Sequence, residues 1–436
     1  MRSLLSLSSS MLLALVASSL GCSGSDDSSA TEPNMVKSDL ARDTAPAATA
    51  ADVAALTSAN ADFAFDFYRT AAPTLGGKNL FFSPHSISVA LAMTYAGARG
   101  TTAQEMAKAL HFAQTPETLH SAVNAVDLAL SSRGKGEKGA DGQPFRLRVI
   151  NSNWANTGTP FEKSFLDTLA RNYGAGMYVT DFAREPEPSR ILINQWTSRQ
   201  TENRINDLIP QGGIGADTRM VLVNAVYFNA EWREKFDAKV TAKQDFKGLD
   251  GTNQSADMMT QLTEISYAET DGYQAVDLPY AGGETSMVVV LPKEGRWATF
   301  ESEFDGSVYR KITSGLAPAN VRVSLPKFKI AGASMSLRES LSSLGMASAF
   351  SGNADFSGIL NRNVDSLMLQ DVLHQAFVNV DESGTEAAAA TAVVLGRGSL
   401  PHDVKAFNAN RPFFFFIRDI PTGALIFFGR VTDPQR

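Results

Sequence analysis

Cysteine is almost absent from this chain: only one of its 436 residues is a cysteine. No disulfide can therefore form within the folded part, and its stability must come from packing. Histidine is scarce too, with five residues that show no HExxH or similar metal-ligand spacing. A G-x-S-x-G nucleophile elbow and a Walker phosphate loop are also missing. These absences leave no specific support for an enzyme, and we expect no metal and no cofactor.

An excess of positive charge is missing as well. Lys and Arg number 39 against 46 Asp and Glu, which gives a net charge of −7. Nucleic-acid-binding proteins normally carry a basic face, so this balance argues against that class. The only dense basic cluster, Arg133–Lys138, lies among glycines. Gly134–Gly139 fits G-x-G-x-x-G but does not follow a strand, so we interpret it as a solvated loop.

The N-terminal apolar run is too short to span a bilayer. Arg2 supplies a positive charge and Met11–Val16 a short apolar core, a pattern typical of a targeting segment. We predict a signal peptide over residues 1–21. An exported protein is therefore expected.

The single cysteine, Cys22, follows Ser19-Leu20-Gly21, which resembles a bacterial lipobox with serine where leucine is usual. We expect Cys22 to be lipidated and to become the mature N-terminus, because free exposed thiols are unusual in exported proteins. Ser23 in the next position suggests sorting to the outer membrane or cell surface. The alternative is an ordinary secretory signal, which would give a secreted or periplasmic protein.

The organisation of the chain changes near Asp52. Residues 22–51 are rich in Ser, Asp, Thr, Ala and Pro, so we predict a disordered tether there. Beyond it, Leu56, Phe63 and Phe67 recur at helical spacing. No second linker follows, so we predict one domain over 52–436.

Helical patterns dominate the first half of the domain and strand patterns the second, which predicts an α+β fold with large mixed or antiparallel sheets. Helices are predicted at 53–70, 86–98, 102–110, 116–130, 161–173 and 188–202. Strands are predicted at 221–229, 257–267, 274–279, 285–291, 320–328, 366–380, 404–407, 412–418 and 424–430.

Residues 381–395 have an ambiguous composition. The four alanines at 387–390 favour a helix, whereas Thr391 and Val393 favour a strand. Composition alone prefers an exposed helix. The following stretch, 396–401, has the glycines and proline of an exposed loop tip. Small side chains followed by an exposed loop favour a segment that is not yet part of a sheet but can later insert into one as a strand.

This stretch resembles the hinge and reactive-centre loop of the serpins, which are metastable serine-protease inhibitors. Other segments resemble serpin motifs in the family's order, from about residue 55 to the C-terminus. They are Phe81–Ser88, Leu91–Met93, Gly97–Thr102, Asn194–Trp196, Thr201–Ile205, Val221–Phe228 with Trp232 and Phe236, Asp277–Tyr280, Ser286–Met287, Leu291–Pro292, Leu325–Phe328, Ala354–Ile359, Asn410–Phe413 and Phe428–Val431.

The resemblance implies roles for particular residues. The hinge would comprise Glu382, Gly384, Thr385, Glu386, Ala387, Ala388, Ala389 and Ala390. A polar "shutter" beneath the opening sheet would comprise Ser83, Ser86, Asn224 and His374, and Trp232 would lie at the "breach", where the loop first inserts. Ordinary core roles are the alternative for each of these five residues. We expect the hinge to be exposed in the native state, and thus tolerant of substitution in folding.

The resemblance also implies a mechanism and a partner. A serine protease would cleave the loop, remain covalently bound, and be trapped when the loop inserts into the main sheet. One register places the scissile bond at Arg397-Gly398, and the commoner register places it at Gly398-Ser399. We favour the first, with a trypsin-like target, because arginine can pair with an acidic pocket. An elastase- or subtilisin-like target is the alternative. We expect a monomer.

Two other functions stay open. A non-inhibitory member of the same fold would act as a carrier, chaperone or structural protein. A generic exported binding module would lack the trapping mechanism altogether. The small residues after Thr385 favour the inhibitor, because a strand that inserts into a sheet needs small, uncharged side chains on its buried face.

Overall fold

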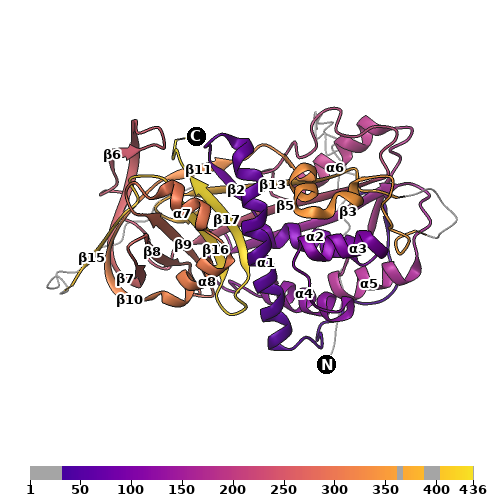
Figure 1. Ribbon diagram of the computed structural model, residues 1–436, viewed down its shortest axis with the longest axis horizontal. Coiled ribbons are helices and arrows are strands. Elements are labelled where there is room, and N and C mark those ends of the chain that lie inside the picture. The colour runs from indigo at the N-terminus through magenta and orange to yellow at the C-terminus, as the bar shows by residue number, and fades with distance from the viewer. Residues whose placement is uncertain (1–31, 361–366, 387–402, 436) are drawn as a thin grey trace, which may run out of the picture. The chain divides into compact units, whose positions relative to one another are not determined.

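The computed structural model describes residues 32–360, 367–386 and 403–435 (Figure 1). The chain divides into Met1–Glu32 and a compact unit, Pro33–Arg436. The predicted domain boundary at residue 52 is therefore too late. The difference lies in the residues before the first helix, which belong to the folded unit.

Residues 33–43 form an ordered segment, here called the N-terminal strap. Within it, β1 (Met35–Val36) pairs antiparallel with β4 (Met177–Thr180). Arg42 forms an ion pair of 2.6 Å with Asp127, and the amide of Asp43 donates to a helix carbonyl. The prediction of a disordered tether is wrong for this stretch. Its composition offers little apolar surface, but pairing at a sheet edge uses backbone groups that composition does not reveal.

The predicted helices are confirmed, with small shifts at their ends. They are α1 (Ala50–Ala71), α2 (Pro84–Tyr95), α3 (Gly100–Ala109), α4 (Pro116–Ser131), α5 (Lys163–Tyr173) and α6 (Pro186–Gln200). Capping explains several starts: the Thr49, Ser83 and Thr115 side chains each accept a hydrogen bond from a first-turn amide. Three helices were not predicted: α7 (Trp297–Glu303), α8 (Gly306–Gly315) and α9 (Arg338–Leu341).

One sheet contains the start of the predicted hinge. Within the described residues it has eight strands in the order β1-β4-β3-β5-β14-β13-β11, and β12 pairs with β13. Its remaining strands are β3 (Arg146–Asn156), β5 (Met220–Glu231), β11 (Phe328–Ala331), β12 (Met335–Ser336), β13 (Asp371–Val380) and β14 (Gly384–Thr385). Strands β5 and β13 are parallel and pair directly from Val221↔Asp371 to Val226↔Ala376. The sequence pattern missed β3, because polar residues interrupt its apolar alternation.

A second sheet packs the C-terminal strands against α1. Its nine strands in the described chain follow the order β15-β10-β7-β8-β9-β16-β17-β2, and β6 pairs with β7. They are β2 (Leu80–Phe82), β6 (Ala242–Lys247), β7 (Asn253–Glu269), β8 (Tyr273–Pro279), β9 (Thr285–Pro292), β10 (Ala317–Pro326), β15 (Lys405–Asn408), β16 (Phe413–Asp419) and β17 (Leu425–Val431).

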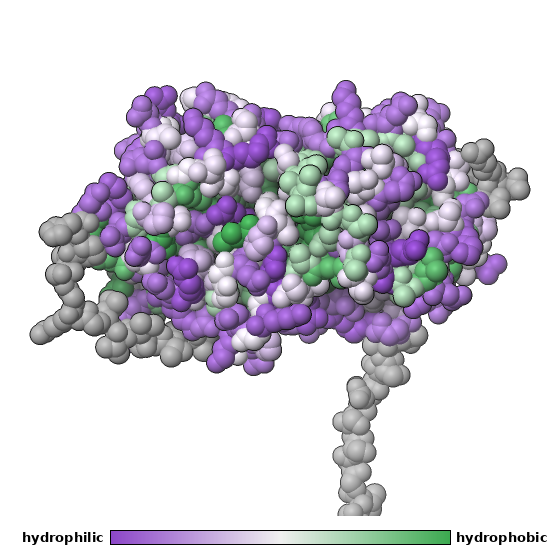
Figure 2. Space-filling model, turned by 90° about the horizontal axis from the view of Figure 1, so that it is seen from below, coloured by the Kyte–Doolittle hydropathy of each residue, from purple (hydrophilic) through white to green (hydrophobic). Residues whose placement is uncertain are grey.

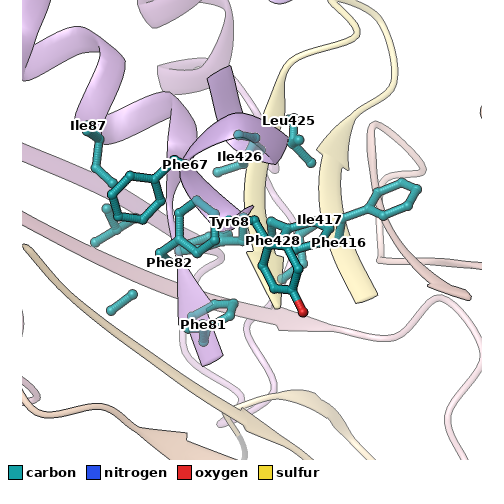
Figure 3. Packing of buried hydrophobic residues seen from close by; sticks show 14 of the residues in the cluster. Phe67, Tyr68, Phe81, Phe82, Ile87, Phe416, Ile417, Leu425, Ile426 and Phe428 are labelled. Atoms are coloured by element: carbon teal, nitrogen blue, oxygen red, sulfur yellow. The ribbon is translucent and has the colours of Figure 1, made fainter. Parts of the chain in front are cut away.

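Aromatic side chains fill the core between α1 and this second sheet (Figure 3). Phe67 of α1 packs on Phe82 with ring centroids 4.9 Å apart, and Phe82 packs on Phe428 at 5.8 Å. The continuous apolar runs 413–417 and 425–428 are fully buried strands, as their lengths predicted. This packing fixes β2 and hence Ser83, the next residue along the chain.

The outer surface is mixed. The face in Figure 2 carries mainly hydrophilic residues, with smaller apolar areas between them. No helix among the described residues has both the length and the apolar character needed to cross a membrane.

Candidate functional site

The start of the predicted hinge already lies within the first sheet. Strand β14 is antiparallel to β5, with Gly384↔Glu231 and Thr385↔Ala230, and antiparallel to β13, with Thr385↔Val380. The Thr385 side chain is 0% exposed. The expectation of an exposed hinge is therefore wrong for these residues. The alternation of small side chains predicted a strand, but it could not show that this strand is already seated.

Close packing explains why Gly384 occupies its position. A Cβ atom there would collide with the carbonyl oxygen of Ala230 on β5. A side chain would therefore separate the strands at the point where the segment enters. The rest of the predicted hinge, Ala387–Ala390, lies outside the described residues, as do Arg397, Gly398, Ser399 and Cys22.

Two aromatic side chains hold the hinge from the core side. Trp232 stacks on Tyr280, with centroids 4.6 Å apart and an interplanar angle of 8°. The Trp232 indole Nε1 donates to the Asp381 carbonyl at 2.9 Å, and its amide donates to the Ser383 carbonyl at 2.9 Å. The Tyr280 hydroxyl lies 2.7 Å from Thr385 Oγ1. Trp232 therefore contacts the hinge where the resemblance places the breach.

Sequence reasoning gave no role to Tyr280. Its hydroxyl is buried and satisfied by Thr385, and this burial raises the pKa of Tyr280. Tyr280 directly follows β8 in the sequence. Its contact with Thr385 could not be predicted, because it depends on the fold that brings the end of β8 beside β14.

A second set of contacts holds Glu382, two residues before β14. The Glu382 carboxylate accepts from Thr241 Oγ1 at 2.8 Å and forms an ion pair of 2.8 Å with Lys327. Its carbonyl accepts from the Phe236 amide at 3.0 Å. The hinge is thus fixed on both sides of Gly384 before any further strand is added.

The four predicted shutter residues meet beneath the same sheet. The Ser83 amide donates to His374 Nε2 at 3.1 Å, and Asn224 Nδ2 donates to Ser86 Oγ at 2.6 Å. The Nδ1 atom of His374 bonds to the side-chain oxygen of Asn224. Because Nε2 accepts, Nδ1 carries the proton and donates to Asn224. Every one of these side chains is 0% exposed.

A fifth polar side chain, Asn151, joins the predicted shutter residues and was not predicted. Ser86 Oγ donates to Asn151 Oδ1 at 3.1 Å, and Asn224 Nδ2 also bonds to this oxygen. Asn151 on β3, Asn224 on β5 and His374 on β13 are in direct register. One polar row therefore crosses three adjacent strands, and its bonds join β5 to β13 where the sheet would have to open. A polar residue on β3 could be assigned to this row only once the register was known.

Burial keeps His374 neutral. It lowers the pKa of His374 from 6.5 to about 3. The unfolded chain therefore takes up a proton between these values that the folded chain does not. The stability from neutral His374 is full above pH 6.5 and is lost as the pH falls toward 3.

We expect the urea midpoint of the native protein to fall over this pH window and His374→Gln to flatten the profile. The slope from one such group reaches about 1.4 kcal/mol per pH unit. Burial also lowers the pKa of His120, to about 4, so the variant should keep part of the slope. The exposed residue His111 provides the control, His111→Gln. Equal slopes in wild type and His374→Gln would contradict the assignment.

The described residues include no group of three or more His, Cys, Asp or Glu side chains placed to hold a metal ion. What they do assemble is a partly opened seam between β5 and β13. At the C-terminal end of β5, β14 lies between the two strands. Nearer the start of β5, Asn224 and His374 join the strands directly.

Comparison with known proteins identifies this arrangement. The family model described as serpin (serine protease inhibitor) matches residues 58–434. A serpin-like protein of Thermococcus kodakarensis is 38% identical, and the match covers 86% of this chain and 84% of the relative. Serpin B3 of Homo sapiens is 36% identical, with 87% and 99% covered.

Solved structures agree with the sequence comparisons. The native state of tengpin, a thermophilic serpin, aligns with a TM-score of 0.80 at 27% identity, covering 92% of this chain and all of that one. Thyroxine-binding globulin complexed with thyroxine aligns at 0.76 and 28% identity, covering 87% and 99%. The same fold is therefore also found in a protein that binds thyroxine.

Proposed function

Because the chain belongs to the serpin family, whose description is serine protease inhibitor, we propose that it is a suicide-substrate inhibitor of a serine protease. The protease serine attacks the scissile carbonyl of the reactive-centre loop and forms an acyl-enzyme, while the peptide C–N bond breaks and the new amine leaves with a proton. The freed hinge end then inserts as a strand and carries the acylated protease with it. The chain therefore acts as a partner of an enzyme and not as one itself.

The observation that carries this proposal is the seat of Thr385 between β5 and β13. Below it, β5 and β13 pair with each other in parallel, whereas β14 is antiparallel to both. Continued insertion replaces one parallel pairing with two antiparallel ones, which are somewhat more stable per residue. The geometry thus gives strand addition a direction and a driving force.

A non-inhibitory role is the second candidate, because a structural relative is known with bound thyroxine. A carrier does not need a hinge that can advance into the sheet. The small inward side chain of Thr385, seated beneath the Tyr280 hydroxyl, favours the inhibitor.

We further propose a trypsin-like target and a scissile bond at Arg397-Gly398. Arg397→Ala should abolish the SDS-resistant complex with trypsin, because alanine offers no charge to the acidic specificity pocket. The exposed Arg184, with 87% of its side chain accessible, gives the matched control Arg184→Ala. The mass of the released fragment should show that it begins at Gly398. A fragment beginning at Ser399, with inhibition retained, would contradict this and point to a protease with a small pocket.

The membrane anchor is a separate proposal, motivated by Cys22 at the end of the targeting segment. We propose that Cys22 is lipidated and that the exported protein is held at a bacterial outer membrane or cell surface. Several acyl chains on one residue give stable anchoring, so Cys22→Ser should move the protein from the membrane to the soluble fraction with protease inhibition intact. If wild type and variant fractionate alike, the signal is an ordinary secretory one.

A further inference from the structure

Strand β14 stops abruptly after Thr385. The next residue, Glu386, has a φ of 63°, in the left-handed region. This conformation is unfavourable for residues other than glycine, and a continuing strand would need an extended backbone instead. Some contact must therefore compensate for the turn that ends the strand.

Asn229 makes that contact. Its side chain is 0% exposed. Asn229 Nδ2 donates to the Glu386 carbonyl at 2.9 Å, and Asn229 Oδ1 accepts from the Ala140 amide at 2.7 Å. One buried amide thus joins the end of β14 to the loop between α4 and β3.

The loop is built to receive this side chain. A Cβ atom on Gly139 would collide with Asn229 Oδ1, so glycine is required beside it. The Lys138 carbonyl accepts from the Glu231 amide at 3.2 Å, which ties the loop to the last residue of β5. Asn229 is therefore clamped in one orientation, with its donor directed at Glu386.

Charged groups hold the Glu386 side chain nearby. Its carboxylate pairs with Arg204, and its side chain is 7% exposed. Arg146 approaches from β3, bonds to the Tyr227 hydroxyl at 3.3 Å and pairs with Glu202 at 3.2 Å. Along β5, Tyr227 and Asn229 alternate with Phe228, whose ring packs on Tyr280 at 5.0 Å. The bonds to Tyr227 and Asn229 therefore lie on the face of the sheet opposite Tyr280.

We propose that Asn229 is a positioning residue that stops β14 after Thr385 and so holds the native loop from advancing into the sheet. The inference rests on the proposed function, since it concerns when the strand is added. To continue the strand, Glu386 must leave the left-handed region and its carbonyl must turn from Asn229 toward a ladder partner. The Asn229 bond to Glu386 thus belongs to the native state and is lost in the inserted state.

The test needs no protease. Intact wild type and Asn229→Ala are incubated at raised temperature, and conversion to a form resistant to urea is followed with time. Loss of a native-only hydrogen bond should speed conversion roughly three- to tenfold. Asn229→Ala also loses the bonds of Asn229 to the Ala140 amide and the Tyr227 hydroxyl, which insertion does not have to break. The melting temperature of the cleaved, inserted protein should therefore fall less than that of the intact protein, whereas a general packing defect would lower both equally.

Two further variants sharpen the result. Asn229→Asp keeps an acceptor for the Ala140 amide but lacks the donor to Glu386, so it should convert at least as fast as Asn229→Ala. Asn156→Ala removes an asparagine from the far end of β3 in the same sheet and should convert at the wild-type rate.

The outcomes separate the two proposals. If cleavage stabilises the wild type but Asn229→Ala converts at the wild-type rate, the stop at Asn229 is wrong and the inhibitor proposal stands. If Asn229→Ala lowers the melting temperature of the cleaved form as much as that of the intact form, its role is general packing and the inference is overturned. If the wild type gains no stability on cleavage, the proposed function fails and takes this role of Asn229 with it.

Discussion

Cleavage of the loop between Ala387 and Leu400 should raise the melting temperature by about 20 °C, contrary to the usual effect of nicking a protein. If insertion adds roughly ten ladder hydrogen bonds at about 1 kcal/mol each, and a domain of this size gains roughly 2 °C per kcal/mol, a shift of this size follows. Strand β14, already antiparallel to both neighbours, is the template from which the strand extends. Calorimetry before and after limited proteolysis measures this change in melting temperature.

The control is a cleaved molecule that cannot insert. Thr385→Arg, cleaved in the same loop, should show no gain, because the charged side chain blocks the strand at its first inward position. An unchanged or lower melting temperature in cleaved wild type would indicate a non-inhibitory serpin. A gain in both proteins would show that the stabilisation has another source.

Thr385→Arg should turn the inhibitor into a substrate and also weaken the native fold. Thr385 is fully buried and bonded to Tyr280, so arginine would place an unpaired charge in the core or expel β14 from the sheet. The ratio of covalent complex to cleaved product on a denaturing gel should fall at least about tenfold, since a slowing of insertion by roughly 1.4 kcal/mol is enough. The native urea midpoint should fall too.

Thr385→Ser is the matched control, because it keeps the hydroxyl that faces Tyr280. It should retain most of the complex and a near wild-type midpoint. Undiminished complex yield in Thr385→Arg would refute insertion as the trapping step. A lost complex with an unchanged native midpoint would show that the hinge is held less firmly than its contacts indicate.

Much of the fold could be predicted from sequence because its elements carry local signals. Helix α1 has both a capping threonine and regular apolar spacing, and the buried runs at 413–417 and 425–428 have the length of strands. Strand β3 gave no such signal, because Asn151 and Ser152 interrupt its apolar pattern. Its place depends on pairing with β5, a long-range contact that no local window contains.

Some residues of the candidate site could likewise be predicted from local motifs, and others could not. The motifs contain Ser83, Asn224 and Trp232, and the family resemblance also implied His374. They did not locate Asn151 or Asn229, whose roles depend on which strands lie beside them. The sequence also did not predict that Thr385 already lies within the sheet. Small side chains permit insertion, but whether Thr385 is inserted in the native state depends on how far β5 and β13 have separated.

The N-terminal strap has a mechanical consequence. A pull on the chain ahead of Pro33 is borne first by the two residue pairs that join β1 to β4 and by the ion pair between Arg42 and Asp127. Strands β4 and β3 lie between this attachment and β5. Tension would therefore peel the strap from the edge of the sheet before it reached the seam that holds Thr385. The strap would therefore detach first, and a molecule under tension would keep Thr385 seated between β5 and β13.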